Sequence, residues 1–189
     1  MKKARQIEIP EDRPLTFEEF EDFKSHALKS SMWYASEYTR SEKQIIEKLL
    51  NKGYVRGDVE YLDEEGETRF FNIIDHVIIH LKEGLVLDDE AYARSLIGRY
   101  SSGRRGASYI RNKLFEKGID SATAERLLAE LRDEDQVLED IEALAQRYMN
   151  SLAYTRADPY RRNQKLTAHL VARGYSFDDI SRWRENQRE

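Results

Sequence analysis

The chain has no cysteine and only 3 prolines and 9 glycines among its 189 residues. Without cysteine it can hold no disulfide, no catalytic thiol and no cysteine-based zinc site. Few prolines and glycines favour helix over sheet, because both residues interrupt helices. No apolar run of signal-peptide length begins the chain, and no stretch approaches 18 apolar residues. We therefore expect a cytoplasmic location and no membrane partner.

Motifs for catalysis, nucleotides and metals are also missing. The sequence has no GxxxxGK[ST], GxSxG or GxGxxG. His76 and His80 are spaced i, i+4, but no cysteine or HExxH pattern accompanies them, so packing in an apolar helix is favoured over a metal site. Acidic residues 88–90 are explained by the start of a helix. We expect no enzyme and no cofactor; a nuclease, the enzyme class considered, would need convergent carboxylates or histidines.

One helix ending occurs three times, as IIEKLLNKGY, IRNKLFEKGI and LTAHLVARGY in residues 45–54, 110–119 and 166–175. Apolar residues four and five apart lie on one helix face. The glycine suits a left-handed C′ position, and the apolar residue after it suits the C″ contact of a Schellman ending. A recurring unit of this kind predicts a repeat protein.

Helix start signals give three helices in each unit. Capping boxes are predicted at Thr16 with Glu19 and at Ser41 with Gln44, and Pro159 begins a helix of the third unit. The first 15 residues are expected to form a mobile tail, and residues 134–154 one long helix. The predicted fold is all-α: an elongated, curved array of three-helix repeats behind an N-terminal helical extension. We expect an extension 1–24 and repeats 25–84, 85–132 and 133–189, with an insertion at 55–68 that forms a weak hairpin.

Charge is segregated along the chain, whose net charge is −5. Residues 99–118 hold six cations against one acid, and residues 156–173 hold five against one, whereas residues 120–142 hold nine acids against two arginines. This pattern predicts a basic face on an acidic body. The candidate residues for contact with a partner or with DNA phosphates are Arg94, Arg99, Arg104, Arg105, Arg111, Lys113, Arg161, Arg162 and Lys165.

Two local features favour a partner over a plain solvated surface. Arg104 and Arg105 lie in a glycine-flanked turn, where a backbone can approach closely. Arg161, Arg162 and Lys165 open a helix, where positive charge opposes the helix dipole. Base stacking on Tyr100 or Tyr109 is a weaker alternative. The first repeat has few such cations, so we expect the second and third repeats to make most of the contacts with a partner.

The segment LDDEAYARSLIGRYSSGRRGASYIRNKLFEKGI, residues 87–119, resembles the RecX family of regulatory proteins. Supporting matches are TRSEKQIIEKLLNKGY and LTAHLVARGYSFDDISRW, so the resemblance covers about residues 25–183. One departure is Ala107, where the family commonly has proline. Another is the acidic net charge, which argues against strong DNA binding without a protein partner.

The resemblance implies a monomeric, non-enzymatic regulator that binds the RecA recombinase filament on DNA. It would lie along the filament groove and mainly inhibit RecA's recombinase, ATPase and co-protease activities, which places it in DNA repair, recombination and the SOS response. The alternative function is a stand-alone nucleic-acid-binding helical-repeat module that contacts single- or double-stranded DNA phosphates.

Overall fold

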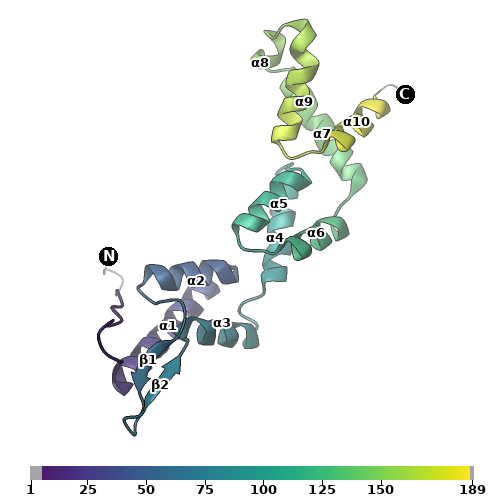
Figure 1. Ribbon diagram of the computed structural model, residues 1–189. Helices are drawn as coiled ribbons and strands as arrows, with labels where there is room; N and C mark the ends of the chain where they lie inside the picture. The colour runs from purple at the N-terminus through teal and green to yellow at the C-terminus, as the bar shows by residue number, and fades with distance from the viewer. Residues whose placement is uncertain (1–5, 188–189) are drawn as a thin grey trace. The chain divides into compact units, whose positions relative to one another are not determined.

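The computed structural model describes residues 6–187 and is built almost entirely of helices, so the predicted all-α repeat fold is confirmed (Figure 1). The chain divides into two compact units, Met1–Tyr92 and Ala93–Glu189. The first helix ending of the repeat lies in unit 1 and the other two lie in unit 2. The boundaries of the three repeats stay a prediction.

Unit 1 packs three helices and a hairpin around one apolar core. The helices are α1 (Phe17–Glu37), α2 (Glu42–Asn51) and α3 (Ile73–Glu83). Both predicted capping boxes are present, because Thr16 and Ser41 exchange hydrogen bonds with Glu19 and Gln44. The core is formed by residues such as Ile45, Leu49, Val77 and Leu81, each at most 1% exposed.

The predicted insertion is a two-stranded antiparallel hairpin, as expected. Strands β1 (Val59–Leu62) and β2 (Thr68–Phe71) pair with Val59 opposite Phe71 and Leu62 opposite Thr68 (Figure 1). The second strand thus extends three residues beyond the predicted insertion. The Phe71 ring lies edge-on to Phe20 of α1, at 5.2 Å between centroids, which joins the hairpin to the core.

The expectation of a mobile tail is wrong for residues 6–15. Ile7 is 3% exposed, and its backbone N–H donates to the Lys52 carbonyl at 2.8 Å. Leu15 is 1% exposed, exchanges backbone hydrogen bonds with β1 and forms a parallel bridge to Tyr61. The segment is acidic, but the burial of its two apolar residues Ile7 and Leu15 holds it against the rest of unit 1.

Unit 2 contains the remaining helices. They are α4 (Asp89–Ser102, which begins in unit 1), α5 (Ala107–Glu116), α6 (Ser121–Glu130), α7 (Glu134–Met149), α8 (Leu152–Thr155), the 3₁₀ turn η1 (Pro159–Arg161), α9 (Arg162–Ala172) and α10 (Phe177–Asn186). The predicted single helix over 134–154 is wrong, because α7 ends at Met149 and α8 is a separate turn. Ser151 starts that turn: its hydroxyl accepts from the Tyr154 N–H, as side chains at a helix start do.

All three predicted Schellman endings are present. In the first, the Tyr54 N–H donates to the Leu49 carbonyl at 3.2 Å and the Gly53 N–H to the Leu50 carbonyl at 3.0 Å. The C′ glycines of the three endings have φ values of 97°, 88° and 100°, as this motif requires. The end of α3 is different: Gly84 is the C-cap, with φ −76°, and Leu85 holds the left-handed position, with φ 54°.

In unit 2 the ending of α9 contacts the start of α5. The Gly106 N–H donates to the Arg173 carbonyl at 3.0 Å, and the Ser108 N–H donates to the Gly174 carbonyl at 3.1 Å. A Cβ on Gly106 would lie 2.3 Å from the Gly174 carbonyl carbon, so the two backbones meet at a distance that only glycine allows. The free carbonyls at the end of α9 thereby satisfy free N–H groups at the start of α5.

Candidate partner-binding surface

Three of the predicted arginines in unit 2 are held by acids of the neighbouring helices. Arg94 forms a bidentate pair with Glu130, with the two N–O distances at 3.0 and 2.9 Å. Arg104 contacts Asp140 at 3.2 Å, and Arg111 pairs with Glu125 through two nitrogens. The hydrogen bond from Arg111 lowers the pKa of Glu125. These arginines stabilise the packing of the α4–α7 segment as well as presenting charge.

The other three predicted cations of this region gather around two tyrosines. Tyr100 of α4 and Tyr109 of α5 contact edge to face, at 5.6 Å between ring centroids. The Arg105 guanidinium lies 4.4 Å from the Tyr109 ring, Arg99 lies 5.3 Å from Tyr100, and the Lys113 ammonium lies 5.7 Å from Tyr109. Cations at these distances are attracted by the ring faces. We call these five residues the Tyr100 cluster.

The cations of the Tyr100 cluster differ in their pairing. Lys113 contacts the Glu116 carboxylate at 2.7 Å, and this bond raises the pKa of Lys113. Within residues 6–187, neither Arg99 nor Arg105 forms an ion pair with a carboxylate. These two guanidinium groups therefore retain their hydrogen-bond donors for an external acceptor.

The turn between α4 and α5 fixes the position of Arg105. Arg104 has φ 52°, a left-handed conformation that few non-glycine residues adopt. The N–H of Arg104 donates to the Ser101 carbonyl at 2.8 Å, and the N–H of Arg105 to the Tyr100 carbonyl at 3.1 Å. The sequence placed the arginine pair in a turn, and the structure shows that its two members point to different contacts, Asp140 and Tyr109.

The second predicted group begins the helix of the third repeat. Arg162 is half-buried and donates to the Thr155 carbonyl at 3.1 Å, so it closes the preceding loop. Arg161 and Lys165 are exposed, and in the described part of the chain neither has an acidic partner. Asp158 caps this helix start by accepting from the Tyr160 N–H at 3.0 Å. Two of the three predicted cations, Arg161 and Lys165, thus lie at the surface without an acidic partner among the described residues.

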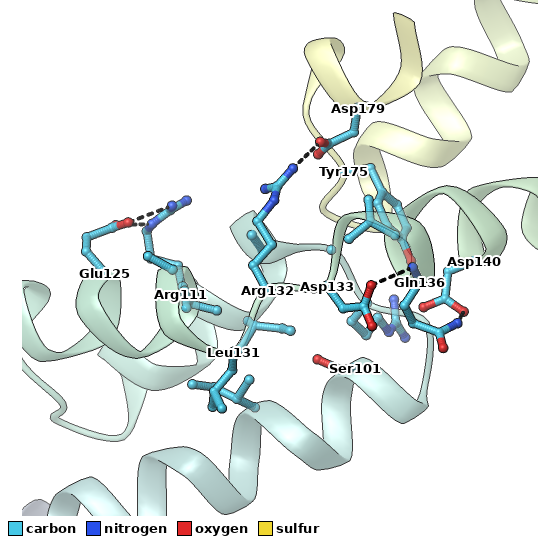
Figure 2. A pocket seen from close by; sticks show the side chains of 18 residues that line it. Ser101, Arg111, Glu125, Leu131, Arg132, Asp133, Gln136, Asp140, Tyr175 and Asp179 are labelled. Atoms are coloured by element: carbon cyan, nitrogen blue, oxygen red, sulfur yellow. Dashed lines mark hydrogen bonds and ion pairs between the residues drawn. The ribbon is translucent and has the colours of Figure 1, made fainter. Parts of the chain in front are cut away.

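A cavity of about 270 Å³ within unit 2 is lined in part by Arg105 of the Tyr100 cluster (Figure 2). Ile97, Ile110, Leu128 and Val137 give it apolar walls, and Figure 2 shows Arg111 turned to Glu125 and Arg132 turned to Asp179 at its rim. The Arg132–Asp179 distance is 2.6 Å.

The acidic side chains that line this cavity are engaged by arginines or by the N–H groups of a helix start. Burial alone would raise the pKa of Asp179, but hydrogen bonds from Ser176 and Arg132 outweigh burial and lower it below its usual value. Burial raises the pKa of Tyr175, whose hydroxyl has no hydrogen-bond partner within the described residues. Carboxylates held in this way by arginines are poor general bases, since they remain ionised and occupied.

The two histidines considered for a metal site pack on one another. His76 and His80 rings lie 6.2 Å apart, and His76 also contacts the Phe71 ring at 5.2 Å. Burial lowers the pKa of His76. Over residues 6–187 no group of three or more histidine, aspartate or glutamate side chains is placed to hold a metal ion. Over the same residues no helix has the length and apolar character to cross a bilayer.

Unit 1 contains a second aromatic and basic cluster that the sequence analysis missed. It consists of Trp33, Tyr34 and Tyr38 at the end of α1, Arg40 in the loop and Lys48 in α2. We call these five residues the Trp33 cluster. The repeat carried the signal for it: when the helix endings are aligned, Arg40 corresponds to Arg105 and to Arg161, and Lys48 corresponds to Lys113.

Two family models match the chain. Residues 134–183 match the third three-helix domain of RecX, and residues 88–128 match the second three-helix domain of RecX. Among curated proteins, the regulatory protein RecX of Clostridium botulinum (strain Alaska E43 / Type E3) is 33% identical over 141 residues, which cover 75% of this chain and 58% of that protein. The regulatory protein RecX of Streptococcus pneumoniae (strain Hungary19A-6) is 30% identical over 180 residues, which cover 93% and 60%.

Solved structures support the fold. The crystal structure of RecX from Lactobacillus salivarius matches with a TM-score of 0.70 and 23% identity over 88% of this chain and 97% of that one. A crystal structure of regulatory protein RecX matches with a TM-score of 0.72 and 22% identity over 88% and 75%. The chain spans about three fifths of the length of the curated relatives named above. Three-helix domains matched in the expected order, curated relatives and fold together show that this chain belongs to the RecX family of regulatory proteins.

Proposed function

We propose that this protein binds the RecA–DNA filament and mainly inhibits RecA's recombinase, ATPase and co-protease activities. The observation that carries the proposal is the Tyr100 cluster, where Arg99 and Arg105 are held on tyrosine rings and pair with no carboxylate of residues 6–187. Membership of a family of regulatory proteins supports a role exerted through binding.

The chemistry of this surface suits an acidic or phosphate-bearing partner. A guanidinium held over an aromatic ring keeps its edge donors outward, and those donors pair with carboxylates or phosphates in a bidentate way. The exposed Arg161 and Lys165 add positive charge in the third repeat. A filament of protein on DNA offers both kinds of acceptor, so the same cations serve for either.

Regulation without catalysis is supported by how the acids are used. Asp120 and Asp133 cap helices, and Glu125, Glu130 and Asp140 are held by arginines. A cytoplasmic location and a monomeric state remain parts of the proposal.

The proposal is tested by the ATPase rate of RecA on single-stranded DNA as the protein is added. We expect inhibition, and we expect Arg99→Glu with Arg105→Glu to weaken it by about tenfold or more, since two attractive contacts become repulsive. The matched control is Arg126→Glu, an exposed arginine of α6 in the same unit and outside the cluster. Circular dichroism shows whether both variants fold. An unchanged ATPase rate and unchanged filament length with the unmodified protein would refute the proposal.

The alternative function, a stand-alone nucleic-acid-binding module, makes a different prediction. Binding would then occur without RecA and would fall steeply with salt, with a log–log slope near −3.5 for about five phosphate contacts on single strands. A pull-down of RecA with and without DNA and nucleotide separates the two functions.

A further inference from the structure

The Trp33 cluster leaves two large rings in solvent. Trp33 is 62% exposed and Tyr38 is 69% exposed, at the end of α1. The core of unit 1 does not need them, because α1 contributes Phe20, Ala27 and Ala35 to it instead. Exposed rings gathered with cations are typical of a surface that contacts a partner.

Two cations lie over the rings of this cluster. The Arg40 guanidinium is 4.1 Å from the Tyr34 ring and 5.3 Å from the Tyr38 ring. The Lys48 ammonium is 4.2 Å from the Tyr34 ring and 5.7 Å from the Trp33 ring. Both cations therefore contact the Tyr34 ring, which orders them.

Neither cation is neutralised by an acid. Within the described residues, Arg40 and Lys48 form no ion pair, the Arg40 Nε is buried without a hydrogen-bond partner, and Lys48 donates to the Ser30 carbonyl. Burial, with the nearby Lys52 and Arg40, lowers the pKa of Lys48 to about 8. A cation held in this way would gain from a nearby anion.

We propose that the Trp33 cluster binds single-stranded nucleic acid, with Trp33 and Tyr38 stacking on bases and Arg40 and Lys48 contacting phosphates. Stacking platforms combined with cations are the general means of binding single strands, because every unpaired base presents a π face. A duplex hides its base faces within its own stack, and an acidic peptide offers no face for the exposed rings. The proposal does not depend on RecA.

The tryptophan fluorescence of the protein can report binding at the Trp33 cluster. Its two tryptophans are Trp33 and Trp183, and Trp183 is 7% exposed in the core of unit 2. In the full-length Trp183→Phe variant, all tryptophan fluorescence comes from Trp33. We expect oligo(dT) to quench this emission at low salt, because a stacked base quenches an indole. Quenching by oligo(rU) with the same dependence on salt also supports the proposal, since base and phosphate are common to both.

Variants separate stacking from charge. Trp33→Ala, followed by fluorescence anisotropy of a labelled oligo(dT), should weaken binding about tenfold, as the loss of one stacked base predicts. Arg40→Gln with Lys48→Gln should make the log–log salt slope shallower by about 1.4, for two phosphate contacts on a single strand. The matched control is Phe70→Ala: this ring is 67% exposed on the hairpin of the same unit and should leave the affinity unchanged. Thermal melts confirm that each variant folds.

Several results would overturn the proposal. They are no binding of oligo(dT) at low salt, affinity unaltered by Trp33→Ala in a folded variant, and duplex DNA bound as tightly as the single strand. Competition by poly-glutamate that is as strong as competition by oligo(dT) would assign the cluster to an acidic protein surface instead. If these results appeared while the protein still inhibited RecA, the proposed function would stand and this inference alone would fail.

Discussion

The Trp33 cluster and the Tyr100 cluster occupy the same two basic positions of the repeat but differ in how those positions are neutralised. Lys48 and Lys113 are equivalent, yet the pKa of Lys48 is lowered to about 8 and that of Lys113 is raised. Burial, with Lys52 and Arg40 nearby, lowers the pKa of Lys48, whereas the hydrogen bond to Glu116 raises that of Lys113. Repeat 1 has Asn51 at the position of Glu116, so the carboxylate that raises the pKa of Lys113 has no counterpart at this position beside Lys48.

The aromatic residues of the two clusters differ as well. In the Trp33 cluster all three rings come from the end of one helix, and two of them are mainly exposed. In the Tyr100 cluster one ring comes from α4 and one from α5, and both are half-buried against each other. The first arrangement leaves ring faces for bases, whereas the second orders guanidinium groups for acidic partners. Equivalent positions in a repeat can therefore carry different recognition chemistry on one scaffold.

The largest expected effect comes from a substitution that disrupts the fold beneath the Tyr100 cluster and leaves the Trp33 cluster intact. Gly174→Ala would place a Cβ 2.5 Å from the Tyr109 N and 2.6 Å from the Tyr109 Cβ, at a residue with φ 100°. Backbone strain and the clash should lower the free energy of unfolding by about 3 kcal/mol and displace Tyr109. Urea denaturation measures the loss.

The control for that variant is Gly57→Ala in unit 1. Gly57 has a similar φ of 93° but no atom within 4 Å of the added Cβ, so only the strain of about 1 kcal/mol remains. When Gly174→Ala is made in the Trp183→Phe variant, the Trp33 emission should report an unchanged Trp33 cluster. Equal losses in the two variants would show that the contact with α5 contributes nothing.

A smaller effect is expected from exchanging the residue that distinguishes the clusters. Asn51→Glu should give Lys48 the i, i+3 partner that Lys113 has, raise the pKa of Lys48 and weaken oligo(dT) binding about fivefold, or about 1 kcal/mol. Glu116→Asn is the reciprocal change and should lower the pKa of Lys113. NMR titration of the lysine side-chain carbons reads both pKa values. A pKa of Lys48 that stays at about 8 in Asn51→Glu would contradict this explanation of the difference.

Much of the scaffold was predictable because it depends on local rules. Capping boxes and Schellman endings follow from residues at fixed spacing, and the structure has them where the sequence predicts them. The segment 6–15 was not predictable in this way. Its attachment depends on Ile7 and Leu15 meeting α2 and β1, a contact between segments distant in sequence.

The candidate surface was predictable only as charge. Composition identifies the cations near residue 104, but it does not show that Arg104 faces Asp140 while Arg105 faces Tyr109. Such pairing depends on where helices separated by tens of residues place their side chains. The Trp33 cluster was missed because its two cations, Arg40 and Lys48, are separated in the sequence and form no basic run. The repeat alignment nevertheless places both at positions that are basic in repeat 2.

The smallest expected effect is an opposite response of the two lysines to alkaline pH. The pKa of folded Lys48 lies below its unfolded value, so between pH 8 and the unfolded pKa the unfolded chain binds more protons and stability rises with pH. The pKa of folded Lys113 lies above its unfolded value, so its contribution is present below the unfolded pKa and is lost as pH rises through the folded one. Lys48 is partly solvated, so its change should amount to tenths of a kcal/mol, and solvent screens the contribution of Lys113 more strongly still. Urea denaturation between pH 7.5 and 9.5 should show a more negative pH dependence for Lys48→Met than for the unmodified protein. Denaturation at pH values above the unfolded pKa of lysine should show a more positive pH dependence for Lys113→Met. Equal slopes in the two variants would mean that Asn51 and Glu116 do not set the difference between the clusters.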